Sequence, residues 1–121
     1  MELSKKYDNV YATLGYFYTL ADEISDEEIS LLDNQLKNDN VIAVGEIGLD
    51  YYDRKDNKDS QKELFEKMLN LAEKHDLPVI VHSRKAMQDT YDILKKHNVA
   101  GSMHSYQGSG EMAEEFIKLG F

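Results

Sequence analysis

Four short apolar stretches alternate along the chain with longer stretches in which apolar residues recur at helical spacing. The apolar stretches are residues 10–14, 41–44, 79–81 and, more weakly, 99–103. The segments between them place apolar residues three and four positions apart, as the buried face of a helix requires. Short strands that alternate with amphipathic helices are typical of βαβ units, so the pattern predicts a parallel sheet covered by helices.

Local signals indicate where the predicted helices begin and end. Ser25 and Ser60 each stand three residues before a glutamate, a spacing that fits a capping box and predicts a helix start at each serine. The second helix should end near His75, because Pro78 disfavours helical backbone at the residue before it. Two further helices are predicted over residues 86–97 and 109–120.

The number of strand–helix units defines the predicted fold class. A (β/α)₈ barrel usually takes about 250 residues, and this chain of 121 residues offers about four βα units. Residues 1–8 look like the last turns of a helix, and Phe121 lies where a further strand is due. We therefore predict a partial TIM (β/α)₈ barrel with parallel strands, forming a single incomplete domain over residues 1–121.

Composition narrows the classes of function. The chain carries 23 acidic and 14 basic residues, and the net charge of −9 is the wrong sign for non-specific nucleic-acid binding. It has no cysteine, which excludes disulfides and thiolate metal sites. No apolar stretch is long enough for a membrane span or a signal peptide, so no membrane partner is expected and the cytoplasm is the default compartment.

Three candidate metal ligands follow successive predicted strands. Glu46 follows residues 41–44, His82 follows residues 79–81, and His104 follows the weak strand that ends at Met103. In parallel α/β folds the chemistry lies at the carboxyl ends of the strands. One carboxylate and two imidazoles suit a divalent ion such as Zn, Mn or Mg. The three positions together predict a metal site at that end of the sheet.

Each of these residues also has an ordinary structural interpretation. Glu46 could form a cap or salt bridge, His82 could be a buried histidine with satisfied hydrogen bonds, and His104 could be a turn residue. Their equivalent positions in consecutive βα units favour the site over these alternatives. His75 and His97 lie near predicted helix C-termini, where an imidazolium suits the helix dipole, and we interpret both as structural.

Further polar residues near the predicted site leave alternatives open. Arg84 could contact an anionic group of a substrate or pair with one of the many acids. The glycines and serines of residues 101–111 precede a helix, where they could bind an anion or simply provide a cap at Ser109. Packing, with base stacking as the alternative, is expected for five tyrosines: Tyr11, Tyr16, Tyr18, Tyr51 and Tyr52.

Three long motifs resemble one known family. They are GEIGLDYY (residues 45–52), SQKELFEKMLNLAEKHDLPVIVHSRKA (residues 60–86) and MHSYQGS (residues 103–109). Together they resemble the TatD-related hydrolases, which are described as metal-dependent deoxyribonucleases. The resemblance is close over residues 41–121 and looser over residues 1–40.

The resemblance implies a (β/α)₈ barrel with two divalent metal ions, of the Zn, Mn or Mg kind. By the family pattern Glu46 is a bridging ligand at the catalytic centre, and His82 and His104 are further metal ligands. The implied reaction is phosphodiester hydrolysis by a metal-activated water, with DNA or another phosphodiester as substrate. Arg84 would then contact that substrate.

The chain also departs from the family pattern. The family's early His-x-His strand and its later strand with a ligating aspartate have no counterpart here, so the ligand set is incomplete and the chain looks like an internal piece of such a protein. We expect weak metal binding, little or no activity of the chain alone, and self-association through open sheet edges. The alternatives are a barrel metal hydrolase that acts on amides or esters, and a non-catalytic fragment.

Overall fold

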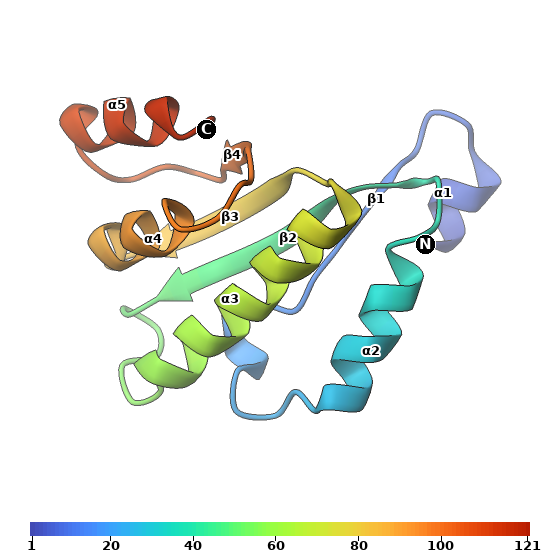
Figure 1. Cartoon of the computed structure of the whole chain (residues 1–121), viewed down its shortest axis with the longest axis horizontal. Helices are drawn as coiled ribbons and strands as arrows, with labels where there is room; N and C mark the ends of the chain where they lie inside the picture. The colour runs from blue at the N-terminus through green and yellow to red at the C-terminus, as the bar shows by residue number, and fades with distance from the viewer.

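A four-stranded parallel sheet with the order β1-β2-β3-β4 forms the centre of the structure (Figure 1). The computed structural model describes all residues, 1–121. Strands and helices alternate as the sequence pattern predicts, which confirms the four βα units. The elements are α1 (Glu2–Lys6), β1 (Ala12–Leu14), the 3₁₀ helix η1 (Tyr18–Leu20), α2 (Asp26–Gln35), β2 (Val41–Asp50), α3 (Lys58–His75), β3 (Val79–Arg84), α4 (Met87–Leu94), β4 (Gly101–Met103) and α5 (Gly110–Lys118).

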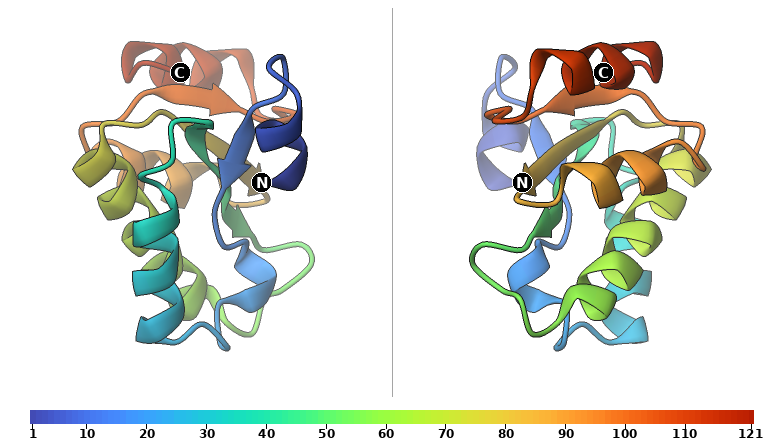
Figure 2. Two further views of the ribbon diagram at one scale, coloured as in Figure 1. Left: turned by 90° about the vertical axis from the view of Figure 1, so that its right-hand side faces the viewer. Right: turned by 90° about the vertical axis from the view of Figure 1, so that its left-hand side faces the viewer.

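The core lies between the sheet and the helices on one of its faces. Helices α2, α3 and α4 lie on the same side of the sheet, and α5 lies next to β4 (Figure 2). On β3 the side chains alternate, because Val79, Val81 and Ser83 are buried whereas the residues between them are partly exposed. Phe65 and Met68 of α3 are almost completely buried in the same core as these valines. The sheet therefore has one face covered by helices and one face with few partners, as half of a barrel requires.

The helix starts agree with the sequence at two positions and differ at a third. Ser25 caps α2 in a capping box, so that predicted cap is confirmed. The Ser109 side chain accepts a hydrogen bond from a backbone N–H of α5, so the structure shows the cap, one of the two alternatives for residues 101–111. The predicted start of α3 at Ser60 is wrong, because the helix begins at Lys58 after Asn57. The Asn57 side chain does not cap the helix and instead accepts a hydrogen bond from Gln61 at 2.9 Å.

Strand β2 is longer than the apolar run that predicted it. The run of residues 41–44 suggested that Glu46 would lie at a strand end, but β2 continues to Asp50. The strand continues because Ile47 and Leu49 are fully buried and extend the apolar side. Glu46 therefore lies within the strand, and Asp50 lies at its carboxyl end.

The glycine of β2 at position 48 serves close packing against β3 rather than a tight turn. Gly48 has φ +137°, and a Cβ atom there would lie 1.9 Å from the carbonyl oxygen of His82. Only glycine tolerates both this backbone conformation and this approach of the neighbouring strand. Gly48 thus allows β2 and β3 to pair closely beside His82.

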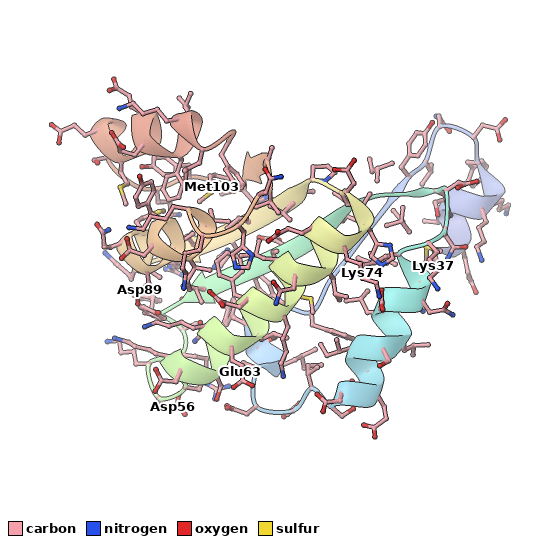
Figure 3. The ribbon with its side chains drawn as sticks, viewed as in Figure 1. Lys37, Asp56, Glu63, Lys74, Asp89 and Met103 are labelled. Atoms are coloured by element: carbon pink, nitrogen blue, oxygen red, sulfur yellow. The ribbon has the colours of Figure 1, made fainter.

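The remaining two histidines link helices at the far end of α3. His75 and Lys74 both contact Asp33 of α2, with 2.6 Å between the nitrogen and the oxygen in each pair, and Lys74 projects from α3 toward α2 (Figure 3). His97 pairs with Glu73 of α3. Their carboxylate partners agree with the structural interpretation of both histidines.

None of the helices has the length and apolar character that crossing a membrane demands.

Candidate metal centre

Glu46 and His82 come together on the less covered face of the sheet. They belong to the adjacent parallel strands β2 and β3, in which Gly48 is the partner of His82. The Glu46 carboxylate lies 3.5 Å from Nδ1 of His82, and the side chains are 35% and 22% exposed. These two sequence-predicted residues are therefore neighbours, although they are separated by 36 positions in the chain.

The geometry of this pair fits the chemistry of a metal site. No hydrogen bond joins the two groups, because 3.5 Å is too long for a good one. Two ligands with bonds of about 2.1 Å to one tetrahedral ion lie about 3.4 Å apart. A carboxylate oxygen and an imidazole nitrogen are also ligands that divalent ions accept. Glu46 and His82 could thus supply two ligands to one ion.

His104 does not join this pair. Its backbone N–H donates to the carbonyl of Val81 at 2.8 Å, which places its backbone next to β3. Its side chain is exposed and makes no hydrogen bond or ion pair. No group of three or more His, Asp or Glu side chains is arranged to hold a metal ion. The role of His104 as a third ligand therefore stays a prediction. Strand β4 ends at Met103, one residue earlier, so the strand does not direct the His104 side chain toward Glu46 and His82.

Arg84 lies on the same face of β3 as His82 but forms no ion pair. Its guanidinium stacks on the ring of Tyr52, with 3.9 Å between the guanidinium carbon and the ring centroid. The alternative of a salt bridge to an acid is therefore not what the structure shows. Stacking occupies the face of the guanidinium and leaves its N–H groups directed outward from the edge. Arg84 is available to bind an anion, and its role toward a substrate stays a prediction.

Asp50 is a residue of the site that the sequence analysis missed. It is 1% exposed, and its Oδ2 atom lies 2.8 Å from Nε2 of His82. Burial acts to raise the pKa of Asp50, but hydrogen bonds from the Asp53 N–H, His82 and the Tyr52 N–H outweigh it and hold that pKa below its ordinary value. The available signal was the spacing of Glu46 and Asp50, because residues four apart in a strand share a face.

Tyr18 of η1 and Phe17, the residue before this helix, complete the surroundings of His82. Tyr18 stacks on the imidazole with 5.4 Å between the ring centroids and an interplanar angle of 18°, and Phe17 contacts it edge-on. The Tyr18 hydroxyl donates to Asp53 at 3.0 Å. Burial, followed by this hydrogen bond, raises the pKa of Tyr18 to about 12. Tyr18 therefore packs at the site as a neutral phenol, in agreement with the packing role expected for the tyrosines.

Comparisons with known proteins place these residues in a family. The family described as "TatD related DNase" matches residues 1–121. The metal-dependent hydrolase YabD of Bacillus subtilis, which is described as uncharacterized, is 38% identical over all of this chain and 49% of its own length. A protein of Encephalitozoon cuniculi, named as a deoxyribonuclease TATDN1 homolog, is 36% identical over 99% of this chain and 42% of its own length.

A solved structure supports the same relationship. The crystal structure of YjjV, a TatD homolog from Escherichia coli, superposes with a TM-score of 0.91 at 35% identity, over 98% of this chain and 47% of that one. The chain thus spans about half the length of the relatives it matches. Its fold is correspondingly about half of the fold of a TatD-type TIM barrel. By its family match over every residue and by these relatives, this chain belongs to the TatD-related DNase family.

Proposed function

We propose that this chain supplies part of the metal centre of a hydrolase that cleaves phosphodiester bonds in DNA. The observation that carries the proposal is the Glu46–His82 pair, whose facing oxygen and nitrogen atoms are 3.5 Å apart without a hydrogen bond between them. The relatives named as metal-dependent hydrolases support the general class, and the relative named as a deoxyribonuclease homolog supports the substrate. The proposal concerns the whole protein, because the chain matches only half of these relatives.

The residues of this chain have separate roles in the proposed reaction. Glu46 and His82 would hold a divalent ion of the Zn, Mn or Mg kind, and His104 would complete the set in the whole protein. Such ions, two in the family site, lower the pKa of a bound water and neutralise charge on a phosphoryl group. Asp50, Tyr18 and Phe17 hold the His82 ring in place.

Arg84 would bind the anionic part of the substrate. Its guanidinium has no carboxylate partner, and the fork of N–H groups matches two phosphate oxygens. The net charge of −9 works against DNA as a partner, so local positive charge at the site is needed. Arg84 and the bound metal ions would provide it.

A chimera can test the proposed reaction in a complete barrel. Residues 1–121 would replace the matching half of E. coli YjjV, and circular dichroism would check that the chimera folds. We expect Mn²⁺- or Zn²⁺-dependent cleavage of an end-labelled DNA oligonucleotide, lost in the Glu46→Gln variant and after chelation. A folded chimera that hydrolyses ester or amide substrates but no phosphodiester would instead support the alternative hydrolase. The 121-residue chain alone should show weak cleavage or none.

A further inference from the structure

Asp50 uses both carboxylate oxygens, and each has a different partner. Oδ1 accepts hydrogen bonds from the backbone N–H groups of Tyr52 at 3.0 Å and Asp53 at 2.8 Å. Oδ2 lies 2.8 Å from Nε2 of His82. The first pair of bonds closes the turn after β2, which is a structural task. The bond from Oδ2 has no part in the turn and points to a second task.

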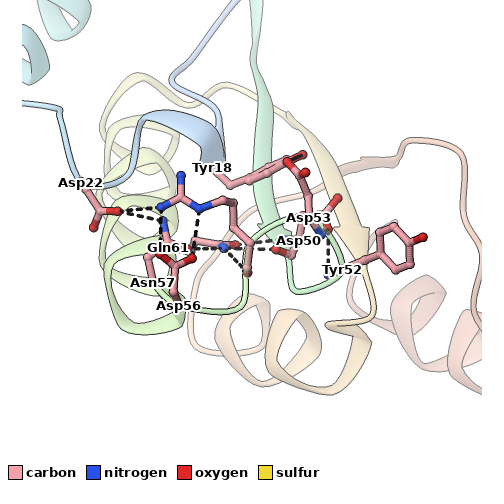
Figure 4. Close-up of polar contacts among 9 residues, drawn as sticks. Tyr18, Asp22, Asp50, Tyr52, Asp53, Asp56, Asn57 and Gln61 are labelled. Atoms are coloured by element: carbon pink, nitrogen blue, oxygen red, sulfur yellow. Dashed lines mark hydrogen bonds and ion pairs between the residues drawn. The ribbon is translucent and has the colours of Figure 1, made fainter.

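The side chain of Gln61 fixes the backbone of Asp50 by two hydrogen bonds. This glutamine of α3 is fully buried, and its Oε1 accepts from the Asp50 N–H at 2.9 Å while its Nε2 donates to the Asp50 carbonyl at 3.1 Å (Figure 4). The Arg54 carbonyl and the Asn57 side-chain oxygen also lie within hydrogen-bond distance of Nε2, so its two N–H groups are shared among three acceptors. Since a buried amide would lose all of these bonds on moving, Gln61 gives Asp50 one defined position.

The His82 ring is thereby held at one nitrogen and on one face. Asp50 contacts Nε2, and Tyr18 stacks on the ring plane. An ionised carboxylate accepts hydrogen bonds and cannot donate one, so Nε2 must carry the proton. In the neutral form of the ring Nδ1 is then the unprotonated nitrogen, and it is the nitrogen that faces Glu46. A carboxylate at the other nitrogen is the usual way in which proteins set the tautomer and orientation of a ligating histidine.

We propose that Asp50 is a positioning residue that holds His82 as the Nε2–H tautomer, with the Nδ1 lone pair directed at the Glu46 carboxylate. The use of Nδ1 as a metal ligand rests on the proposed function, whereas the tautomer itself belongs to the metal-free chain. Gln61 acts one step further back, because it fixes Asp50. Neither Asp50 nor Gln61 needs to touch a metal ion or a substrate to do this.

An Asp50→Asn substitution separates this role from the role in the turn. The amide oxygen of asparagine can still accept from the two backbone N–H groups, so the turn keeps its bonds. The amide nitrogen would face Nε2 as a donor and would favour the opposite tautomer of His82. A residue that only closes the turn would therefore tolerate the change without any effect on the imidazole. Asp53→Asn is the matched control, because Asp53 contacts Tyr18 but not His82.

Long-range proton–nitrogen NMR spectra of the 121-residue chain can read the tautomer directly. The His82 signals are those that disappear in a His82→Gln variant. In spectra of the neutral His82 ring, we expect a protonated Nε2 and an unprotonated Nδ1 in the wild type and in Asp53→Asn, and the reverse in Asp50→Asn. In the same samples, Zn²⁺ affinity measured by competition with a chromophoric chelator should fall about 10- to 100-fold in Asp50→Asn.

The outcomes distinguish this proposal from the proposed function. A neutral His82 ring that carries its proton on Nδ1 in the wild type, or a His82 spectrum that Asp50→Asn leaves unchanged, would overturn the positioning role. The expected tautomers combined with no Zn²⁺ binding in any variant would support the role of Asp50 and count against the metal site. If Asp50→Asn does not fold, the wild-type spectrum still decides, because a neutral ring protonated at Nε2 supports the role and one protonated at Nδ1 overturns it.

Discussion

The guanidinium of Arg84 lies over the ring of Tyr52 and forms no ion pair, although the chain has 23 acidic residues. Asp50, the neighbour of Arg84 in the strand register, is already bonded to His82 and to backbone N–H groups. The carboxylate of its register neighbour is thus occupied, and the arginine lies over an aromatic ring instead. This arrangement leaves a cation with free donors two residues from a candidate metal ligand.

The first prediction concerns anion binding by Arg84. In an NMR titration with a thymidine dinucleotide, Arg84→Gln should abolish the shift changes of residues 82–84. Arg84→Lys should weaken binding about 2- to 5-fold, because it keeps the charge but loses a stacking contact of about 0.5–1 kcal/mol. Lys37→Gln, two residues after the end of α2, removes one charge and is the control. Equal weakening in that control would show that only the net charge matters.

The second prediction concerns the close approach of β2 to β3. Gly48→Ala should lower the free energy of unfolding by about 2–4 kcal/mol, because the new Cβ collides with the His82 carbonyl and φ is +137°. Gly110→Ala is the matched control, since a Cβ there meets nothing within 4 Å and the residue begins α5. It should be neutral or stabilising by up to about 1 kcal/mol. Urea unfolding followed by circular dichroism measures both; similar values for the two variants would contradict the packing argument.

The order of the elements could be predicted from the sequence because it depends on patterns that are local in the chain. Runs of valine and isoleucine, helical spacing and the serine caps at Ser25 and Ser109 all report on neighbouring residues. The start of α3 could not be predicted, because the Asn57 side-chain oxygen accepts a hydrogen bond from the Gln61 side chain and not from a backbone N–H of the first turn. That hydrogen bond depends on the shape of the turn before α3, which tertiary contacts determine.

The candidate site, too, could be predicted only in part. The motif positions predicted that Glu46 and His82 would meet, and they do. The only sign of Asp50 was its spacing of four residues from Glu46, and an aspartate followed by two tyrosines looks instead like a simple turn. The prediction that His104 lies beside Glu46 and His82 depended on β4, and this strand ends at Met103, before His104. Contacts that depend on the exact length of two strands lie beyond what residue spacing can show.

The third prediction concerns the acid sensitivity of the link between α2 and α3. Hydrogen bonds from Lys74 and then His75 hold the pKa of Asp33 below its ordinary value. A lowered pKa in the folded state means that the carboxylate stabilises the fold above its unfolded-state pKa of about 3.9, and that this stability is lost as pH falls through the folded-state pKa. Asp33→Asn should therefore lower Tm at pH 7, and its difference from the wild type should shrink below about pH 4.

The measurement for Asp33 is Tm against pH by circular dichroism. The control is Asp39→Asn, because Asp39 is exposed and makes no ion pair or side-chain hydrogen bond. It should follow the wild type across the whole range. A constant difference between Asp33→Asn and the wild type at every pH would show that the carboxylate charge is not the cause.

The fourth prediction separates the metal ligands that the structure brings together from the one that it does not. Zn²⁺ or Mn²⁺ should raise the Tm of the chain, since a ligand that binds only the folded state stabilises it by mass action. Glu46→Gln and His82→Gln should each remove the shift. His104→Gln should leave it in place in this chain, because the His104 side chain contacts neither residue. Loss of the shift in His104→Gln would mean that the three side chains converge when metal binds.

The last prediction concerns self-association at the edge of the sheet formed by β4. This strand has β3 as its only neighbour, and beside it lies a hollow of about 300 Å³ lined mostly by apolar side chains of β4, α5 and the C-terminal residue. Ile117 of α5 lines the hollow and is 65% exposed. An open parallel edge next to exposed apolar surface is where a second copy would bury most area.

Sedimentation velocity at micromolar concentrations should therefore detect dimers or larger species of the 121-residue chain. Ile117→Lys should shift the population toward monomer, because a charge in the hollow would have to be buried without a partner. Leu31→Lys is the matched control, since Leu31 is also an exposed helical residue, at 55%, but lies on α2 away from this edge. A monomeric wild type would contradict the prediction, and equal dissociation in both variants would assign the effect to net charge rather than to the edge at β4.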